Sequence, residues 1–132
     1  MNSEIYCWVS VESTSRSVVD INAFDSTPDQ VWSIGDKLHG TLLRRKTNGI
    51  SFKSRLPISS SLREHVLAVL SRFSKNDKAR FRRMKHVMIT LHIAIYDIVD
   101  PPIYLEPDLL NEIASIGAAL DVDVYNLGGT KS

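Results

Sequence analysis

The sequence has few of the features that mark secreted or membrane-spanning proteins. It holds one cysteine among 132 residues, Cys7, so no internal disulfide can form and a reducing cytoplasm is the expected compartment. Its apolar runs are strand-sized, well short of the roughly 20 residues that a membrane span needs. The first residues, MNSEIYCWVSVES, lack a basic segment followed by an apolar one, and so predict no secretory signal. We expect no membrane partner.

Motifs for catalysis and cofactor binding are also missing. None of the six glycines forms a phosphate-cradling pattern, and no serine-nucleophile motif occurs. The four histidines do not have the spacing of a zinc site: His39, His65, His86 and His92. A Cys-His nucleophilic pair is open in principle, but Cys7 falls on the apolar side of its segment and is better interpreted as a small buried hydrophobe. We predict no enzyme, metal, cofactor or small-molecule substrate.

Two acids, Asp121 and Asp123, stand two residues apart in an apolar stretch near the C-terminus. With Asp97, Asp100 or His92 they would make an oxygen-rich cluster suited to a hard cation, as in a metal-dependent hydrolase. Alternation on a half-exposed strand is the commoner cause of this spacing. We therefore interpret both acids as outward-facing strand residues.

Charge is segregated along the chain, although the net charge is only +1. Residues 37–85 carry 14 of the 16 Lys and Arg and have a net charge of +12. Residues 1–36 have a net charge of −5, and residues 86–132 of −6. Such blocks predict either charge pairing across the fold or two surfaces of opposite sign.

Three segments alternate with the period of a β-strand: 4–12, 86–98 and 118–126. Their inward sides carry mainly aliphatic residues: Ile5, Cys7, Val9, Val11, Ile89, Leu91, Ile93, Ile95, Leu120, Val122 and Val124. Residues 103–105 predict a short edge strand, and Asp100-Pro101-Pro102 should end the strand before it. Asn48-Gly49 is the strongest hairpin signal, because this pair tolerates the positive φ of a type I′ turn.

Helices are predicted between these segments. Ser61 and Glu64 form a capping box at the start of an apolar stripe, and Pro107 opens a helix that Gly117 should end. Asn76 is expected to cap a short polar helix, and Ser15 or Ser17 a shorter one after the first strand. Hairpins and irregular spacing argue against a doubly wound sheet. We predict one α+β domain over residues 1–132, with a mostly antiparallel sheet and two to four helices packed on one face.

Two stretches carry a family resemblance: IYLEPDLLNEIASIGAALDVDVYN near the C-terminus and, more weakly, STPDQVWSIGDKL. They resemble the bacterial family called domain of unknown function 4279, in a closing pattern of short strand, Leu-rich helix ending in Gly, and an apolar–acidic alternation reaching a Tyr. The resemblance implies a fold and no common reaction. Proteins of this size and type also resemble immunity proteins of bacterial toxin systems, including contact-dependent growth inhibition. By analogy we expect a cytoplasmic immunity protein that forms a 1:1 complex with a cognate toxin.

If the three long strands share a sheet whose helices cover only the aliphatic side, the other side collects aromatic and acidic residues. Aromatic anchors ringed by carboxylates suit a basic protein partner. The predicted partner-binding residues are Tyr6, Trp8, His92, Tyr96, Asp121, Asp123 and Tyr125. Coverage of that side by the hairpin or the first helix is the competing interpretation.

The basic middle of the chain supports an alternative function, a nucleic-acid-binding module that uses a 44–55 hairpin and a 78–85 helix. Its predicted contacts are Arg44, Arg45, Lys46, Lys53, Arg55, Arg80, Arg82 and Arg83. Aromatics that would stack on bases are few here, only Phe52 and Phe81, and both fit the core better. A solvated face paired with the acidic flanks is the simpler interpretation.

Overall fold

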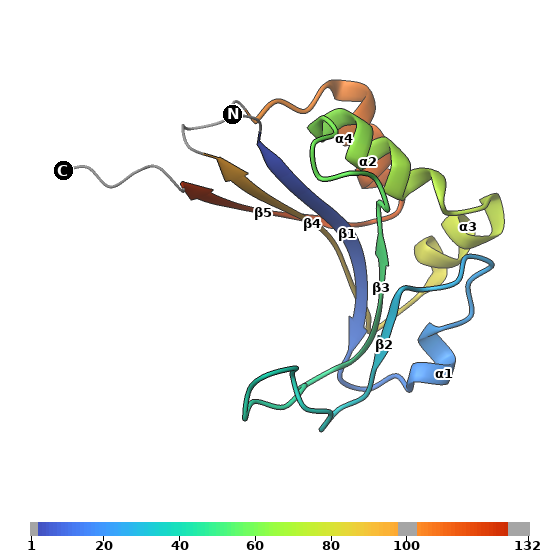
Figure 1. Cartoon of the computed structure of the whole chain (residues 1–132). Coiled ribbons are helices and arrows are strands. Elements are labelled where there is room, and N and C mark those ends of the chain that lie inside the picture. The colour runs from blue at the N-terminus through green and yellow to red at the C-terminus, as the bar shows by residue number, and fades with distance from the viewer. Residues whose placement is uncertain (1–2, 98–102, 127–132) are drawn as a thin grey trace.

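The computed structural model describes residues 3–97 and 103–126. Its strands are β1 (Glu4–Ser13), β2 (Gln30–Trp32), β3 (Asn48–Lys53), β4 (Met88–Asp97) and β5 (Ala119–Asn126). Its helices are α1 (Val18–Ile21), α2 (Leu62–Ser71), α3 (Lys75–Arg83) and α4 (Pro107–Ser115). The strands form one sheet in the order β2-β3-β1-β4-β5, with the helices gathered on one side of it (Figure 1).

The sheet is mostly antiparallel, as predicted. β1 pairs antiparallel with both β3 and β4, and β2 pairs antiparallel with β3. β5 is parallel to β4, because the chain between them returns through α4 before it enters the sheet again. The α+β class and the placement of the helices on one face are therefore confirmed.

Alternation along β1 and β4 decides which face meets the helices. In β1, Cys7, Val9 and Val11 are at most 3% exposed, and in β4 the inward residues Leu91 and Ile93 are equally buried. Residues in the helices or just after them complete the same core: Val66, Val69, Phe73, Phe81, Leu109, Ile113 and Ile116. Burying each large apolar side chain contributes roughly 1.5–3 kcal/mol, so this face fixes the strand register.

The helix starts follow local capping chemistry. Ser61 caps α2 in the predicted box, accepting from the Glu64 N–H while the Glu64 carboxylate accepts from the Ser61 N–H. Ser17 caps α1, as one of the two predicted serines. The predicted cap Asn76 is wrong, because Ser74 starts α3 in a second capping box with Asp77. The Ser74 hydroxyl accepts from the Asp77 N–H, three residues further along, and this geometry satisfies a free N–H donor of the first helical turn.

The predicted turn at Asn48-Gly49 is wrong. Both residues belong to β3, and the chain instead reverses within residues 33–47, where Lys37 and Arg44 form an isolated bridge. Gly49 is small for a packing reason, because a Cβ there would lie 2.2 Å from Cζ2 of Trp32 on the neighbouring strand. The glycine therefore admits an indole ring across the sheet, and no positive φ is involved.

Two other predictions need correction or restriction. Residues 103–105 form no strand, and the β5 segment pairs with β4 in their place. The predicted stop at Asp100-Pro101-Pro102 lies outside the described residues. In β5, Leu120 and Val124 are on the helix side yet remain 42% and 41% exposed, because β5 is the edge strand and α4 overlies it only in part.

Candidate partner-binding face

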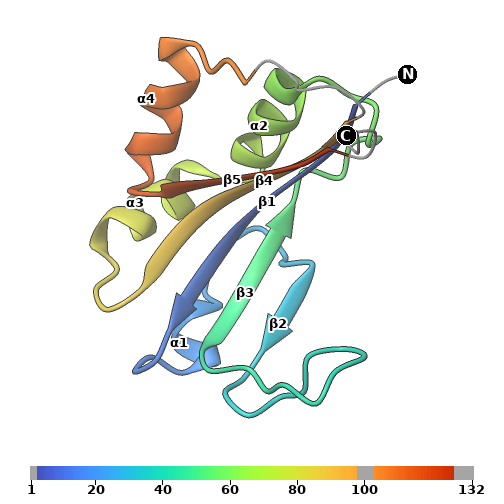
Figure 2. The same cartoon turned by 90° about the vertical axis from the view of Figure 1, so that its left-hand side faces the viewer.

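The side of the sheet away from the helices, called the open face below, gathers all seven predicted partner-binding residues. β1 contributes Tyr6 and Trp8, and the other five lie at alternate positions on β4 and β5: His92, Tyr96, Asp121, Asp123 and Tyr125. No helix of the described residues crosses this face, and Figure 2 looks onto it directly. The competing interpretation holds in part: the 33–47 loop covers Trp32 at the β2 end of this face, where Arg45 lies over the ring, whereas α1 packs on the helix side.

Register places the rings in contact. Tyr6 meets Tyr96 edge to face, with ring centroids 5.7 Å apart, and Tyr96 stacks on Tyr125 at 4.6 Å. Trp8 stacks on His92 at 4.9 Å, with an interplanar angle of 9°. Because each ring is held by the next, binding to this surface immobilises few free rotamers.

His92 joins the aromatic and acidic residues of the open face. Its Nδ1 lies 3.5 Å from the Asp121 carboxylate, and its Nε2 lies 2.8 Å from Oγ of Ser10. In the neutral tautomer with its proton on Nδ1, facing the carboxylate, Nε2 accepts from the Ser10 hydroxyl. Ser10 thereby helps to hold the ring on which Trp8 stacks.

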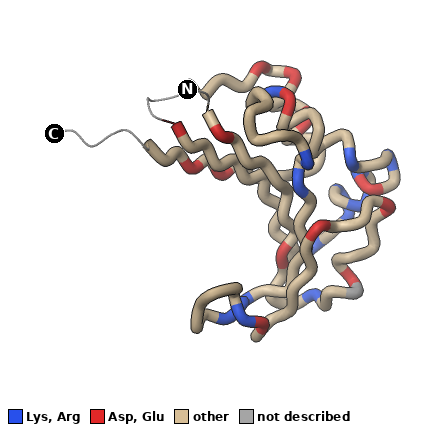
Figure 3. Tube along the Cα trace, viewed as in Figure 1, with Lys and Arg blue, Asp and Glu red and all other residues tan. Residues whose placement is uncertain are grey.

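Exposure separates this face from the core. Tyr6 and Tyr125 are 41% and 46% exposed, and Asp123 is exposed without an ion pair among the described residues. Asp and Glu residues gather along this part of the sheet, whereas the Lys and Arg residues of the 33–47 loop lie at the opposite end of the sheet (Figure 3). The open face is thus an aromatic surface with an acidic border, which complements positive charge.

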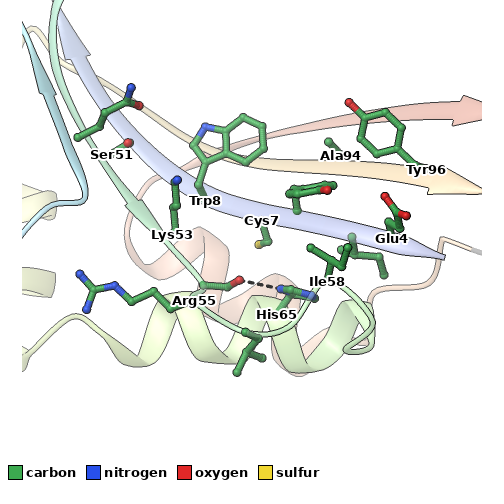
Figure 4. Close-up of a pocket in the computed structure, with 15 residues that line it drawn as sticks. Glu4, Cys7, Trp8, Ser51, Lys53, Arg55, Ile58, His65, Ala94 and Tyr96 are labelled. Carbon is green, nitrogen blue, oxygen red and sulfur yellow. Dashed lines mark hydrogen bonds between the residues drawn. The ribbon is translucent and has the colours of Figure 1, made fainter. Parts of the chain in front are cut away.

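A pocket opens on this face at the end of β3. After Lys53 the chain leaves the sheet and crosses to α2 through residues 54–58, tied to β1 only by bonds from the Ser54 N–H to the Cys7 carbonyl and from the Ile5 N–H to the Ile58 carbonyl. The gap left beside β1 is lined by Tyr6, Trp8, Ala94 and Tyr96 of the open face, by Ile5, Cys7, Leu56, Ile58 and His65, and by polar residues at its rim (Figure 4). No sequence pattern predicts this pocket, because it depends on where β3 ends.

Cys7 and His65 lie together at the base of this pocket, which raises again the question of nucleophilic chemistry. Burial raises the pKa of the Cys7 thiol to about 12, so the reactive thiolate is absent at neutral pH. Burial also lowers the pKa of His65, against the smaller opposing effects of the Pro57 carbonyl and Glu64. His65 Nδ1 lies 2.7 Å from Oγ of Ser54, which ties the crossover segment to α2. These groups support a packing role.

Metal binding finds no support in the described part of the chain. No group of three or more His, Cys, Asp and Glu side chains converges there. Asp121 and Asp123 point from alternate positions of β5 beside His92, while Asp97 lies on the opposite face of β4 and Asp100 lies outside the described residues. Within those bounds, the acids form a border and no chelating cluster.

The predicted nucleic-acid contacts fall in three separate places. Arg44, Arg45 and Lys46 lie in the 33–47 loop, Lys53 and Arg55 at the pocket rim, and Arg80, Arg82 and Arg83 on α3. Figures 1 and 2 both show α3 on the helix side, away from that loop. The predicted 44–55 hairpin does not form, since β3 begins inside it. The basic residues therefore do not make one continuous surface.

Several of these cations are already engaged within the fold. Arg55 donates to Asp29 at 2.8 Å, and Arg45 lies 4.4 Å over the Trp32 ring. Arg44 donates to the Gly35 carbonyl, and Arg80 to that of Asp20. Internal engagement of these four favours the interpretation in which the basic middle pairs with the rest of the chain.

The charge pairing has a centre that the sequence analysis missed. Asp29, just before β2, accepts from Arg72 at the end of α2, from Arg55, and from the Lys53 N–H. Burial alone would raise the pKa of Asp29, but these donors outweigh it and lower that pKa to about 2. The segregated charges pointed to pairing, but only the fold brings residues 29, 55 and 72 together.

Comparison with known proteins gives a family and no activity. A family model described as "Domain of unknown function (DUF4279)" matches residues 3–127, so the chain belongs to that family, as the two resembling stretches indicated. No curated protein and no solved structure matches the chain. In the described residues, no helix is long and apolar enough to cross a membrane.

Proposed function

We propose that this protein acts by binding another protein through the open face, and that its partner is a bacterial toxin which it neutralises in a 1:1 complex. One observation carries the proposal. Aromatic rings in mutual contact and exposed carboxylates share a sheet face that no described helix covers. Exposed aromatics in an ordered array are the residues that dominate binding energy at interfaces.

The acidic border favours a basic partner surface. Asp121 and Asp123 are exposed, and Asp121 is paired only with a histidine among the described residues. Toxins that cut nucleic acid carry basic active sites, so a carboxylate-rich face suits their inhibition by direct cover of the site. In this proposal the protein works in the cytoplasm, where such a toxin would act, and performs no catalysis itself.

Co-expression with the product of the neighbouring gene tests this function. We expect the chain to protect cells from that product and to co-purify with it at a 1:1 ratio. Replacing Tyr125 with Ala should weaken the complex by about tenfold or more if the ring is an anchor. Tyr104→Ala is the matched control, because Tyr104 is 71% exposed and lies outside the open face. Unchanged affinity in the Tyr125 variant and in an Asp121→Lys, Asp123→Lys variant would rule out the open face.

The nucleic-acid alternative keeps only the cations that the fold leaves exposed without a described partner, such as Lys46, Arg82 and Arg83. Because they lie on two separate parts of the molecule, we place this function second. It requires binding to DNA or RNA that weakens steeply with salt. A flat titration at low ionic strength would remove it.

A further inference from the structure

The pocket beside β1 has the size of a ligand site and opens within the open face. Its volume is about 630 Å³, inside the range of roughly 300–1,000 Å³ typical of sites that enclose a ligand or an inserted side chain. Its position follows from the early end of β3, which leaves the first half of β1 without a strand partner on that side. An interface built on the open face therefore surrounds a recess.

The walls of the pocket favour an apolar, flat occupant. Ile5, Cys7, Leu56 and Ile58 supply aliphatic and thiol surface, and Ala94 leaves room between the larger side chains. Trp8 and Tyr96 enter from the open face, as Figure 4 shows, and Tyr6 lines the pocket from the same face. Aromatic rings pack well against such walls through offset or edge-to-face contacts, which add to the gain from burial.

Charge at the rim decides between an aromatic and a cationic occupant. Lys53 and Arg55 lie at one end and Glu4 at the other, separated along β1 by four residues, since Lys53 is opposite Trp8. Asp29 neutralises Arg55, but Lys53 has no ion pair among the described residues. An inserted Lys or Arg would be repelled by Lys53, and an inserted carboxylate by Glu4. A neutral side chain avoids both costs.

We propose that the partner inserts one neutral aromatic side chain, Tyr, Phe or Trp, into this pocket, with its own basic residues reaching the carboxylates of β5. The proposal rests on the proposed function and adds to it the chemistry of the partner's anchor. It assigns the pocket as the central site of the interface and the acidic border as its rim, the arrangement in which buried anchors contribute most.

Free amino-acid amides test the pocket without the partner. The probes are N-acetyl-tyrosinamide, N-acetyl-leucinamide and N-acetyl-argininamide, titrated into ¹⁵N-labelled protein and followed by amide chemical shifts. We expect saturable binding of the tyrosinamide with a dissociation constant on the order of 1 mM, as for small fragments. The shifts should centre on Tyr6, Trp8 and Ala94. Equal or tighter binding of the leucinamide or argininamide, or shifts scattered over the helix side, would overturn the proposal.

A filled pocket extends the test to the complex. Ala94→Phe places a ring inside the pocket, and Thr90→Phe adds the same ring on the same strand and face but outside the lining residues. The first change should abolish tyrosinamide binding and weaken the toxin complex by about tenfold or more, and the second should leave tyrosinamide binding intact. If Ala94→Phe does not fold, Ile58→Trp closes the pocket from its half-exposed rim.

The two proposals fail in different ways. If the complex keeps full affinity when the pocket is filled but loses affinity with the Tyr125 and Asp121 changes, the aromatic anchor is refuted and the proposed function stands. If no substitution on the open face changes the affinity of the complex, the proposed function is refuted. If Ala94→Phe does not reduce the binding of the tyrosinamide, the fragment binds elsewhere, and the pocket is refuted as its site.

Discussion

Replacing Asp29 with Asn should destabilise the protein in a pH-dependent way. The substitution keeps the shape of the side chain and removes the charge that holds Arg72 and Arg55. A fall in the pKa of Asp29 from 3.8 to about 2 corresponds to about 2.4 kcal/mol of native-state stabilisation by linkage. The Arg55 side chain is 58% exposed, so solvent screens part of that. We expect a loss of about 1–2 kcal/mol at pH 7.

The sign of the pH effect follows from the lowered pKa. The stabilisation is fully present above pH 3.8, the ordinary value, and disappears as pH falls through about 2, where Asp29 is protonated in the folded protein too. Urea unfolding of both proteins between pH 7 and pH 2 measures the difference, and a ¹³C titration of the Asp29 carboxyl measures its pKa directly. Asp20→Asn is the control, because Asp20 is exposed and, within the described residues, its carboxylate makes no ion pair. Equal stability of the Asp29 variant at pH 7, or an ordinary Asp29 pKa, would refute the reasoning.

Two further predictions concern the packing of Gly49 against Trp32 and the buried thiol of Cys7. Gly49→Ala should cost about 1–3 kcal/mol in urea unfolding, since its Cβ would meet the Trp32 ring; in a Trp32→Ala background the cost should largely vanish, and full additivity would contradict the packing argument. Cys7, whose pKa burial raises to about 12, should react with a disulfide reagent at pH 8 orders of magnitude more slowly in the native protein than in urea. Comparable rates would show that the thiol is accessible.

Strand alternation was the most informative part of the sequence. It assigned Cys7 and Val9 to the core and Tyr6 and Trp8 to the opposite side, because a buried face leaves only one register. The open face could therefore be listed residue by residue once three strands were assumed to share a sheet. That assumption was the single step that the sequence could not supply, and the structure confirms it.

Local signals failed where a distant partner decided the outcome. Asn48-Gly49 has the composition of a turn, but Trp32 requires the glycine within the sheet. Asn76 is a good cap, but Ser74 forms the reciprocal pair with Asp77, which also accepts from the Asp25 N–H across the fold. The pocket could not be predicted for the same reason, since it exists because β3 ends early and leaves the first half of β1 without a strand partner on that side. Contacts of this kind depend on which elements become neighbours in the fold, and they produce no periodic pattern in the sequence.

The role of the charges was predicted only in outline. The segregation of basic and acidic blocks indicated either pairing or opposed surfaces, and the structure contains both. Arg72 pairs with Asp29 across the fold, while Asp121 and Asp123 stay at the border of the open face. Length and composition cannot separate the two outcomes, because each depends on which elements become neighbours.

The central claim is that the open face binds the partner, and mapping the contact surface by NMR cross-saturation in the complex with the neighbouring gene product tests it most directly. Saturation should transfer to amides of β1, β4 and β5, centred on Tyr6, Trp8 and Tyr125, and should spare α2 and α3. Transfer concentrated on the helix side, with the open face unaffected, would contradict the account.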